Sequence, residues 1–272
     1  MYKRQVPYKP VAINPIEVSQ IEKLHVDTSP LERVTAITMS VDVQKDRLEY
    51  QVMEHDKWTD EAHIVEHQTI PQSTNLSIAW SQLSEVIKKH EPCMVFIDIG
   101  YDPSRMKDNI LEREDYIVRT IRNVEPWSDL FWRKRVKLTR GLGSYTSTQT
   151  RFIMKEPKQD TENYDLILGT HMGKSRVISL LNEGKMTIAR GKVTKNFNKQ
   201  LVNEYLAPIE GNKGKKPEVE WKKVAGQRNE AFDCAYMNMC ALKYLGVEHD
   251  RSGGAQLEMS RLINSMSKTS EE

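Results

Sequence analysis

Three aspartates occupy positions where carboxylates could act together. Asp42 ends the strand predicted within VTAITMSVDVQ, a segment of alternating polar and apolar residues, and Asp98 ends a nearly continuous apolar run within CMVFIDIGY. Asp233 lies one turn into RNEAFDCAYMNMCALKYLG, a predicted helix from Arg228 to Gly246 whose apolar residues recur every three or four positions. A half-buried carboxylate needs a partner, because an unpaired one in a low dielectric costs several kcal/mol or becomes protonated.

Metal ligation is the chemistry that would bring these acids together. Ligands gather at the carboxyl ends of strands in α/β sheets, so two parallel neighbours would place Asp42 beside Asp98, and the helix could add Asp233. Three converging carboxylates cannot all ionise unless a cation neutralises them, and all-oxygen ligation suits Mg²⁺ or Mn²⁺. Each aspartate also has a structural explanation: Asp42 can open a turn, Asp98 can cap a connection, and Asp233 can complement the helix dipole.

The order of predicted elements is that of an α/β protein with a mixed sheet. Alternating segments joined by short turns predict an antiparallel meander at residues 34–44, 47–55 and 61–70. Periodicity predicts helices at 77–90, 104–113, 171–181 and 197–206, and strands at 93–101, 116–124, 165–170 and, at a sheet edge, 186–190. Residues 125–162 are expected to form loops or hairpins, and 207–226 a long β-hairpin. Asn229 is the expected N-cap and Gly246 the expected stop of the last helix.

The composition is that of a polar globular chain whose basic residues are clustered. The 272 residues carry a net charge of only +2, yet Lys and Arg concentrate in WRKRVKLTR, ARGKVTKNFNK and KGKKPEVEWKK, which favours a polyanionic partner. No apolar run approaches the roughly 20 residues of a membrane helix, so no membrane partner is expected. Cys93, Cys234 and Cys240 lack the spacing of a zinc site and are expected to be reduced, buried thiols of a cytosolic protein.

Three segments resemble the nuclease half of the lambda-type (GpA) phage terminase large subunit. They are VTAITMSVDVQKDRLEYQV, VFIDIGY and WKKVAGQRNEAFDCAYMNMCALKYLG, and the resemblance extends with gaps from Pro30 to Gly246. It implies an RNase H-like fold, a mixed sheet with helices on both faces, and cutting of double-stranded, concatemeric viral DNA during packaging. The family's three acids fall on Asp42, Asp98 and Asp233. Ile99 departs from the family pattern, in which a small serine follows the second acid.

The resemblance also implies partners and a domain organisation. The partners would be double-stranded DNA, a terminase ATPase domain, the terminase small subunit and the portal protein, in the host cytoplasm. GTHMGKS imitates a phosphate-binding loop but has three residues between its glycines where the Walker pattern needs four, so no ATPase motif is expected in this chain. Residues 34–246 are then expected to be the nuclease domain, 1–33 an arm or linker with one helical turn, and 247–272 a flexible tail.

The reaction expected from these acids is two-metal phosphodiester hydrolysis. Asp42 would bridge two ions about 4 Å apart, Asp98 would hold one and Asp233 the other. Glu230 is a candidate fourth acid, although a first-turn Glu also complements the helix dipole, and His171 is a candidate proton shuttle, although a surface histidine is the simpler interpretation. Basic residues are expected to grip phosphates without reading sequence: Arg133, Lys134, Arg135, Lys174, Lys215 and Lys216.

Two other functions fit the same residues. A transposase or Holliday-junction resolvase-type nuclease would share the carboxylate site, but its products would be strand transfer or junction-specific nicks. A non-catalytic docking module would bind DNA through the basic loops and a capsid-assembly protein through the tail. Its binding would be insensitive to changes at the three aspartates.

Overall fold

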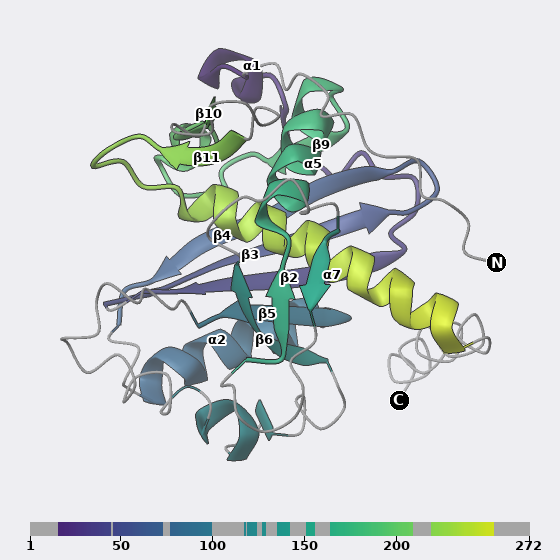
Figure 1. Ribbon diagram of the computed structural model, residues 1–272, viewed down its shortest axis with the longest axis vertical. Coiled ribbons are helices and arrows are strands. Elements are labelled where there is room, and N and C mark those ends of the chain that lie inside the picture. The colour runs from purple at the N-terminus through teal and green to yellow at the C-terminus, as the bar shows by residue number, and fades with distance from the viewer. Residues whose placement is uncertain are drawn as a thin grey trace, which may run out of the picture.

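A mixed sheet is the centre of the molecule. The computed structural model describes residues 16–44, 46–72, 77–99, 117, 119–123, 127–128, 135–141, 151–155, 164–208 and 219–252. Within these ranges nine strands form one sheet in the order β1-β9-β4-β3-β2-β5-β6-β8-β7, with helices on both faces (Figure 1). The predicted mixed α/β sheet is therefore confirmed.

The middle of the sheet is the predicted meander, extended by parallel strands. β2 (Ala36–Val43), β3 (Leu48–Asp56) and β4 (Glu61–Ile70) pair antiparallel in chain order. β5 (Met94–Asp98) pairs parallel with the other side of β2, and β6 (Val136–Gly141) pairs parallel with β5. Because β2 has a hydrogen-bonded neighbour on each side, its position is fixed more firmly than that of an edge strand.

Shorter strands complete both ends of the sheet. β8 (Leu166–Leu168) runs parallel to β6, and β7 (Ile153–Lys155) runs antiparallel to β8. At the other end β9 (Met186–Ala189) lies between β4 and the two-residue β1 (His25–Val26), parallel to both. β10 (Glu204–Pro208) and β11 (Val219–Lys223) form a separate antiparallel pair, which confirms the predicted hairpin outside the main sheet.

Alternation along the strands separates two cores, one on each face. Met39 and Val41 of β2 pack in the core that includes α2 (Ser77–His90), so Thr38, Ser40 and Asp42 lie on the opposite face, under α7 (Glu230–Ser252). The α7 face also carries three shorter helices: α1 (Val18–Glu22), α5 (Thr170–Asn182) and α6 (Phe197–Leu201). In Figure 1, α7 crosses the sheet as a long diagonal helix with α5 beside it.

Two predicted elements have a different secondary structure. Residues 117 and 119–123 are helical and not a strand. Ile117 and Ile121 are four residues apart and both are buried in the core beside α2, a helical spacing that the apolar run concealed. The predicted helix 197–206 was too long: α6 ends at Leu201, because Glu204–Pro208 pair with β11.

Three other features of the fold also differ from the prediction. β9 is an inner strand and not an edge, and β6 is an inner parallel strand where loops or hairpins were expected. Gly246 does not stop α7, which continues to Ser252. Its φ is not positive, so it lacks the left-handed conformation of a C-terminal cap.

The described part of the predicted N-terminal arm is packed into the domain. Ile21 of α1 is fully buried, and β1 pairs with β9. Residues 1–15, the predicted helix 104–113 and residues 253–272 lie outside the described ranges. Cys93, Cys234 and Cys240 carry free thiols; the second and third are buried and the first is half-buried. In the part of the chain that the structure describes, no helix has the length and apolar character that crossing a membrane requires.

Two helical glycines should respond in opposite ways to alanine. A Cβ at Gly173 of α5 would lie 2.9 Å from Cδ2 and 3.0 Å from Cβ of Tyr236 in α7, so G173A should lower Tm, at a cost of about 1–3 kcal/mol. A Cβ at Gly246 would meet no atom within 4 Å, so G246A should stabilise α7 by up to about 1 kcal/mol. Thermal melts followed by circular dichroism measure both changes. A higher Tm for G173A would contradict the close packing of α5 on α7.

Candidate active site

Carboxylates of three adjacent strands form a row on the face of the sheet that carries α7. Asp42 pairs in parallel register with Asp98 of β5 and in antiparallel register with Glu49 of β3. Adjacent strands lie about 4.8 Å apart, so the three acids are direct neighbours. Asp42, in the middle, is 8% exposed, and Glu49 is fully buried. Asp98 ends β5 as predicted, whereas β2 continues one residue beyond Asp42, to Val43.

Neutral polar groups fix the position of α7 along β2. Asn238 Nδ2 donates to Ser40 Oγ at 2.8 Å, and Asn238 Oδ1 accepts from Thr38 Oγ1 at 2.8 Å. One turn earlier on α7, the carbonyl oxygen of Cys234 accepts from Ser40 Oγ at 2.8 Å. A buried polar group left unsatisfied costs about 1–3 kcal/mol, so one register of the helix is strongly favoured. That register brings Asp233, in the first turn, close enough to Asp42 for their charges to interact.

Two residues accept hydrogen bonds from the N–H groups at the start of α7. Asn229 O accepts from the N–H groups of Phe232 and Asp233 at 2.8 and 3.0 Å, which agrees with the predicted N-cap position. The side chain of Asn229 does not cap the helix. Instead Gln200 Oε1, from α6, accepts from Ala231 N–H at 3.0 Å. The amide of Asn229 is therefore available to bind carboxylates.

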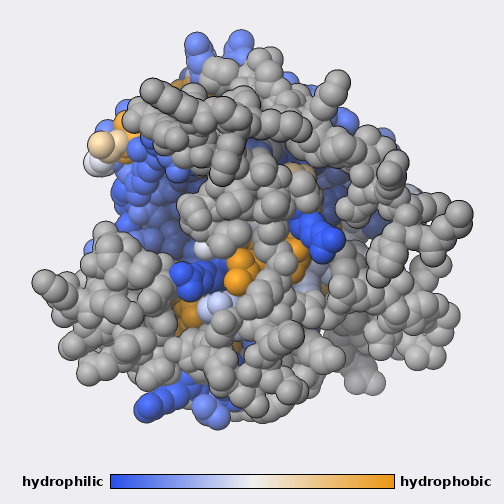
Figure 2. Space-filling model, in the orientation of Figure 1, coloured by the Kyte–Doolittle hydropathy of each residue, from blue (hydrophilic) through white to orange (hydrophobic). Residues whose placement is uncertain are grey.

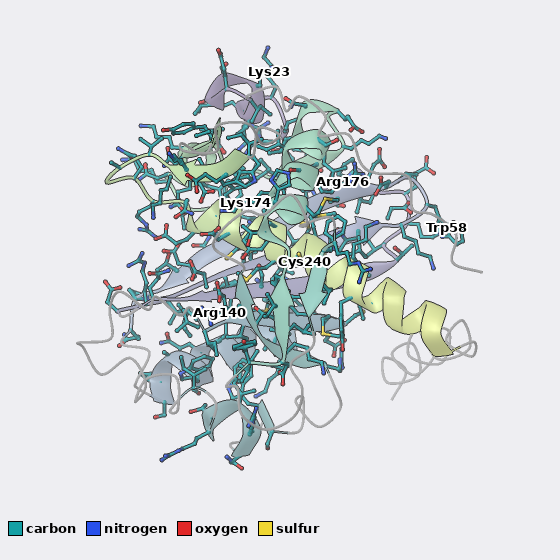
Figure 3. All side chains as sticks on the ribbon, in the orientation of Figure 1. Lys23, Trp58, Arg140, Lys174, Arg176 and Cys240 are labelled. Atoms are coloured by element: carbon teal, nitrogen blue, oxygen red, sulfur yellow. The ribbon has the colours of Figure 1, made fainter. Side chains whose placement is uncertain are left out.

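Asp233 is held by two donors that also bind a second acid. Lys174 Nζ, from α5, lies 2.8 Å from Asp233 Oδ1, and Asn229 Nδ2 donates to Asp233 Oδ2 at 2.8 Å. Lys174 Nζ also lies 2.6 Å from Oε2 of Glu204, the first residue of β10, and Asn229 Nδ2 also donates to Glu204 Oε1. Figure 3 labels Lys174 beside the first turns of α7, next to the hairpin. The GTHMGKS segment forms the N-cap, Gly169, and the beginning of α5.

Sharing Lys174 between two acids leaves negative charge in excess. Burial lowers the pKa of Lys174, but the charges of Asp233 and Glu204 outweigh burial and raise it, so the lysine stays charged at neutral pH. Burial raises the pKa of Asp233, and Lys174 offsets this only partly because Glu204 shares the same ammonium.

Asp42 has more negative than positive charge around it. Burial raises its pKa well above the usual value, and the charges of Asp233 and Asp98 raise it further. Gln44 Nε2, which donates to Asp42 Oδ2 at 2.9 Å, opposes the shift. Among the described residues, no Lys or Arg side chain forms an ion pair with Asp42. A bound cation would relieve this imbalance.

Two arginines balance the remaining acids of the site. Arg47 donates to Glu49 Oε1 at 2.6 Å and to Glu230 Oε1 at 2.9 Å. Arg228 binds Glu49 Oε1 and, at 3.2 Å, Glu230 Oε2. Burial tends to raise the pKa of Glu230, but a backbone hydrogen bond and the two arginines lower it overall, so Glu230 stays ionised. Glu230 lies near the site, and its charge contributes to the raised pKa of Asp42.

The carboxylate oxygens of the three aspartates are suitable ligands for a divalent metal, although the side chains are not arranged around one. In the described ranges, no three or more His, Cys, Asp or Glu side chains are grouped so that they could hold a metal ion. Lys174 and Asn229 occupy the two oxygens of Asp233. Asp42, Asp98 and Asp233 nevertheless supply only oxygen ligands, which Mg²⁺ and Mn²⁺ prefer, and the charges of Asp98 and Asp233 raise the pKa of Asp42. A divalent ion on Asp233 Oδ1 would therefore require Lys174 to release that oxygen.

The other predicted site residues are placed differently. Arg135 precedes β6 and donates to Pro92 O at 2.7 Å, whereas Thr139, the neighbour of Asp98, lies four residues further along, about 13 Å away at 3.3 Å per residue. Arg135 is therefore at the opposite end of the sheet from the acids. His171 is buried near the start of α5, where burial lowers its pKa. The remaining four fall outside the described ranges: Arg133, Lys134, Lys215 and Lys216.

Sequence reasoning missed Glu49 and Glu204. The position of Glu49 could have been predicted by counting residues outward from the turn of the first hairpin. Gln44 N–H donates to Arg47 O, so Val43 pairs with Leu48 and Asp42 pairs with Glu49. Glu204 gave no comparable signal, because its segment was predicted to be helical and helical spacing does not bring it to Lys174.

The family model for the endonuclease domain of the terminase large subunit gpA matches residues 17–252. The chain belongs to this family. The match includes the acid row, α7 and the hairpin, so the resemblance carried by DVQKDRLEY and RNEAFDC is confirmed. The expected RNase H-like mixed sheet is confirmed with it.

Solved structures similar to this member of the gpA endonuclease family include other viral nuclease domains. The nuclease domain of the large terminase subunit gp2 of bacterial virus Sf6 has a TM-score of 0.46 at 10% identity, covering 82% of this chain and 97% of that chain. The Mn-soaked human cytomegalovirus terminase nuclease domain has a TM-score of 0.43 at 11% identity, covering 82% and 91%. The yeast mitochondrial Holliday junction resolvase Ydc2 has a TM-score of 0.38 at 9% identity, covering 92% and 90%. A comparison with curated proteins gave no match.

Replacing Asp42 should stabilise the metal-free protein. The folded-state pKa of Asp42 lies above its unfolded value, so stability is greatest below the unfolded pKa and falls as pH rises through the folded one. D42N removes the buried charge. In chelator at pH 7 it should melt above the wild type, by about 2–4 °C for each 1 kcal/mol recovered. The difference should shrink as the pH falls towards the unfolded pKa.

Calorimetric melts of both proteins between pH 5 and 8 test this expectation. E85Q is a suitable control, because Glu85 is an acid on α2 whose side chain is 66% exposed, and its replacement should change Tm little. A D42N protein that melts at or below the wild-type temperature at pH 7 would contradict the charge imbalance around Asp42.

Proposed function

We propose that the chain is a divalent-metal-dependent endonuclease that cuts double-stranded viral DNA during genome packaging. The observation that carries the proposal is the direct register pairing of Asp42 with Asp98, joined by Asp233 from α7, with excess negative charge at Asp42. Membership of the terminase endonuclease family supports the substrate and the setting.

The three aspartates would hold two ions, either Mg²⁺ or Mn²⁺. Asp42 is central, with Asp98 on one side and Asp233 facing it from the helix, so it would contact both ions. Ions held there would supply an activated water and would stabilise the leaving 3′ oxygen. Gln44 holds one oxygen of Asp42, and Asn229 holds one oxygen of Asp233. These hydrogen bonds orient the carboxylates before DNA arrives.

The residues around the aspartates prepare the site for a polyanion. Arg47 and Arg228 balance Glu49 and Glu230, which limits the negative potential that a DNA phosphate would meet. Lys174 neutralises Asp233 in the metal-free protein, which is a different role from the predicted grip on DNA. A divalent ion on Asp233 would repel the Lys174 ammonium and displace it from Oδ1.

Phosphate binding is assigned to the basic clusters of the sequence. Contacts to phosphates hold DNA without reading its sequence, and they weaken as salt rises. The residues proposed for it are Arg133, Lys134, Lys215 and Lys216. The proposed protein partners are those of the family: the terminase ATPase domain, the small subunit and the portal protein.

Asparagine at position 42, 98 or 233 should abolish nicking of supercoiled plasmid in Mn²⁺. Each substitution keeps the side-chain shape and removes a charged ligand. The loss should be at least the roughly 10–100-fold that changes around metal ligands cause. D56N is the matched control: Asp56 is buried at the far end of β3, where Oδ1 accepts from Trp58 N–H at 2.9 Å, and asparagine retains that acceptor. Cleavage retained by all three site variants would exclude the mechanism.

The products distinguish this function from its alternatives. Cuts in both strands of a plain duplex support a packaging endonuclease. Nicks confined to four-way junctions, or strand transfer, would favour a resolvase or transposase. DNA binding without cleavage in any divalent metal, unchanged by the three aspartate substitutions, would favour a docking module.

A further inference from the structure

Glu204 is a buried carboxylate to which the proposed endonuclease mechanism gives no role. It is the first residue of β10, outside the main sheet that carries Asp42 and Asp98. Its side chain is 5% exposed, as is that of Lys174, whose Nζ lies 2.6 Å from Glu204 Oε2. A buried carboxylate needs compensation, so its presence beside the site requires an explanation.

Four side chains form a closed ring of hydrogen bonds at the start of α7. Lys174 and Asn229 are the donors, and each of them binds both Glu204 and Asp233. Asp233 is the outer member, with a side chain 25% exposed, whereas Glu204 is the inner one. A cation arriving from solvent therefore reaches Asp233 before Glu204.

The backbone holds Glu204 in place independently of Asp233. Glu204 pairs with Lys223 across the hairpin, and Val224 N–H donates to Asn203 O at 2.8 Å. Asn203 Nδ2 donates to Arg228 O at 2.6 Å, which ties the base of the hairpin to the start of α7. Glu204 can thus stay where it is while the ligands of Asp233 change.

We propose that Glu204 is a positioning residue of the endonuclease site. It keeps the ammonium of Lys174 paired and in place when a divalent cation replaces that ammonium as the partner of Asp233. This inference rests on the proposed function. Without Glu204, metal binding at Asp233 would leave a charged lysine buried with no carboxylate partner, which is strongly unfavourable. With Glu204 present, Lys174 loses one of two ion pairs and remains compensated.

Titration of metal-free protein with MnCl₂ in a calorimeter, without DNA, tests the role of Glu204. E204Q should weaken Mn²⁺ binding by about tenfold or more, the scale of changes beside metal ligands. E220Q is the matched control, because Glu220 lies on β11 of the same hairpin, 3.3 Å from Lys222, and has a partly exposed side chain. It should bind Mn²⁺ within twofold of the wild type. Equal binding by E204Q and E220Q overturns the inference.

Once Lys174 is removed, replacing Glu204 should no longer change the affinity for Mn²⁺. K174M leaves no ammonium to compensate, so K174M and K174M/E204Q should bind Mn²⁺ within twofold of each other. The pair keeps the inference testable even if E204Q alone does not fold, since replacing both charges of a buried ion pair is often tolerated. Weaker binding by the double variant would show that Glu204 acts as a metal ligand or through packing, and would overturn the inference.

Failure of the endonuclease proposal gives a different result. In that case wild-type protein binds no Mn²⁺, or D42N cleaves DNA like the wild type, whatever the E204Q variant does. Mn²⁺ binding that D42N abolishes and E204Q leaves intact removes only the role of Glu204.

Discussion

Repulsion among acids is the constraint on which the arrangement around the start of α7 depends. Six carboxylates gather there: Asp42, Glu49, Asp98, Glu204, Glu230 and Asp233. Arg47 and Arg228 pair with Glu49 and Glu230, and Lys174 pairs with Glu204 and Asp233. At Asp42, burial and the charges of Asp233, Asp98 and Glu230 all raise the pKa. Asp42 is also the centre of the proposed metal site.

The scaffold that tolerates this repulsion is neutral. Asn238 and the hydroxyls of Thr38 and Ser40 join α7 to β2 through buried hydrogen bonds, and Gln200 caps the helix. Because β2 is hydrogen-bonded on both sides, the helix is fastened to a rigid strand. Figure 2 shows the outer side of this face, where hydrophilic residues gather on the left, around the start of α7 and the hairpin. The protein thus separates the groups that set geometry from the groups that carry charge.

Sequence reasoning predicted the parts of the site that depend on strand order and missed those that depend on contacts distant in sequence. Period-two alternation and short turns located the meander, and an apolar run located β5. Asp42 and Asp98 were expected side by side if their strands were parallel neighbours, and the structure pairs them in this way. Residues 117 and 119–123 were misjudged because an apolar run of that length suits either a strand or a helix. Glu204 depends on pairing across the hairpin, and its contact with Lys174 joins residues that no local pattern relates. The residues alone offered Asp233 only as a possible third ligand, and the family resemblance then matched it to the family's third acid.

The neutral contact between α7 and β2 has a consequence for how ionic strength acts on the molecule. Dissolved salt screens charges that face water, but it has little effect on hydrogen bonds between uncharged groups in the interior. DNA held by phosphate contacts dissociates as the salt concentration rises, whereas the hydrogen bonds between α7 and β2 stay the same. High salt should therefore dissociate DNA from the proposed nuclease without unfolding the protein. Dilution alone should then return the activity, with no refolding step.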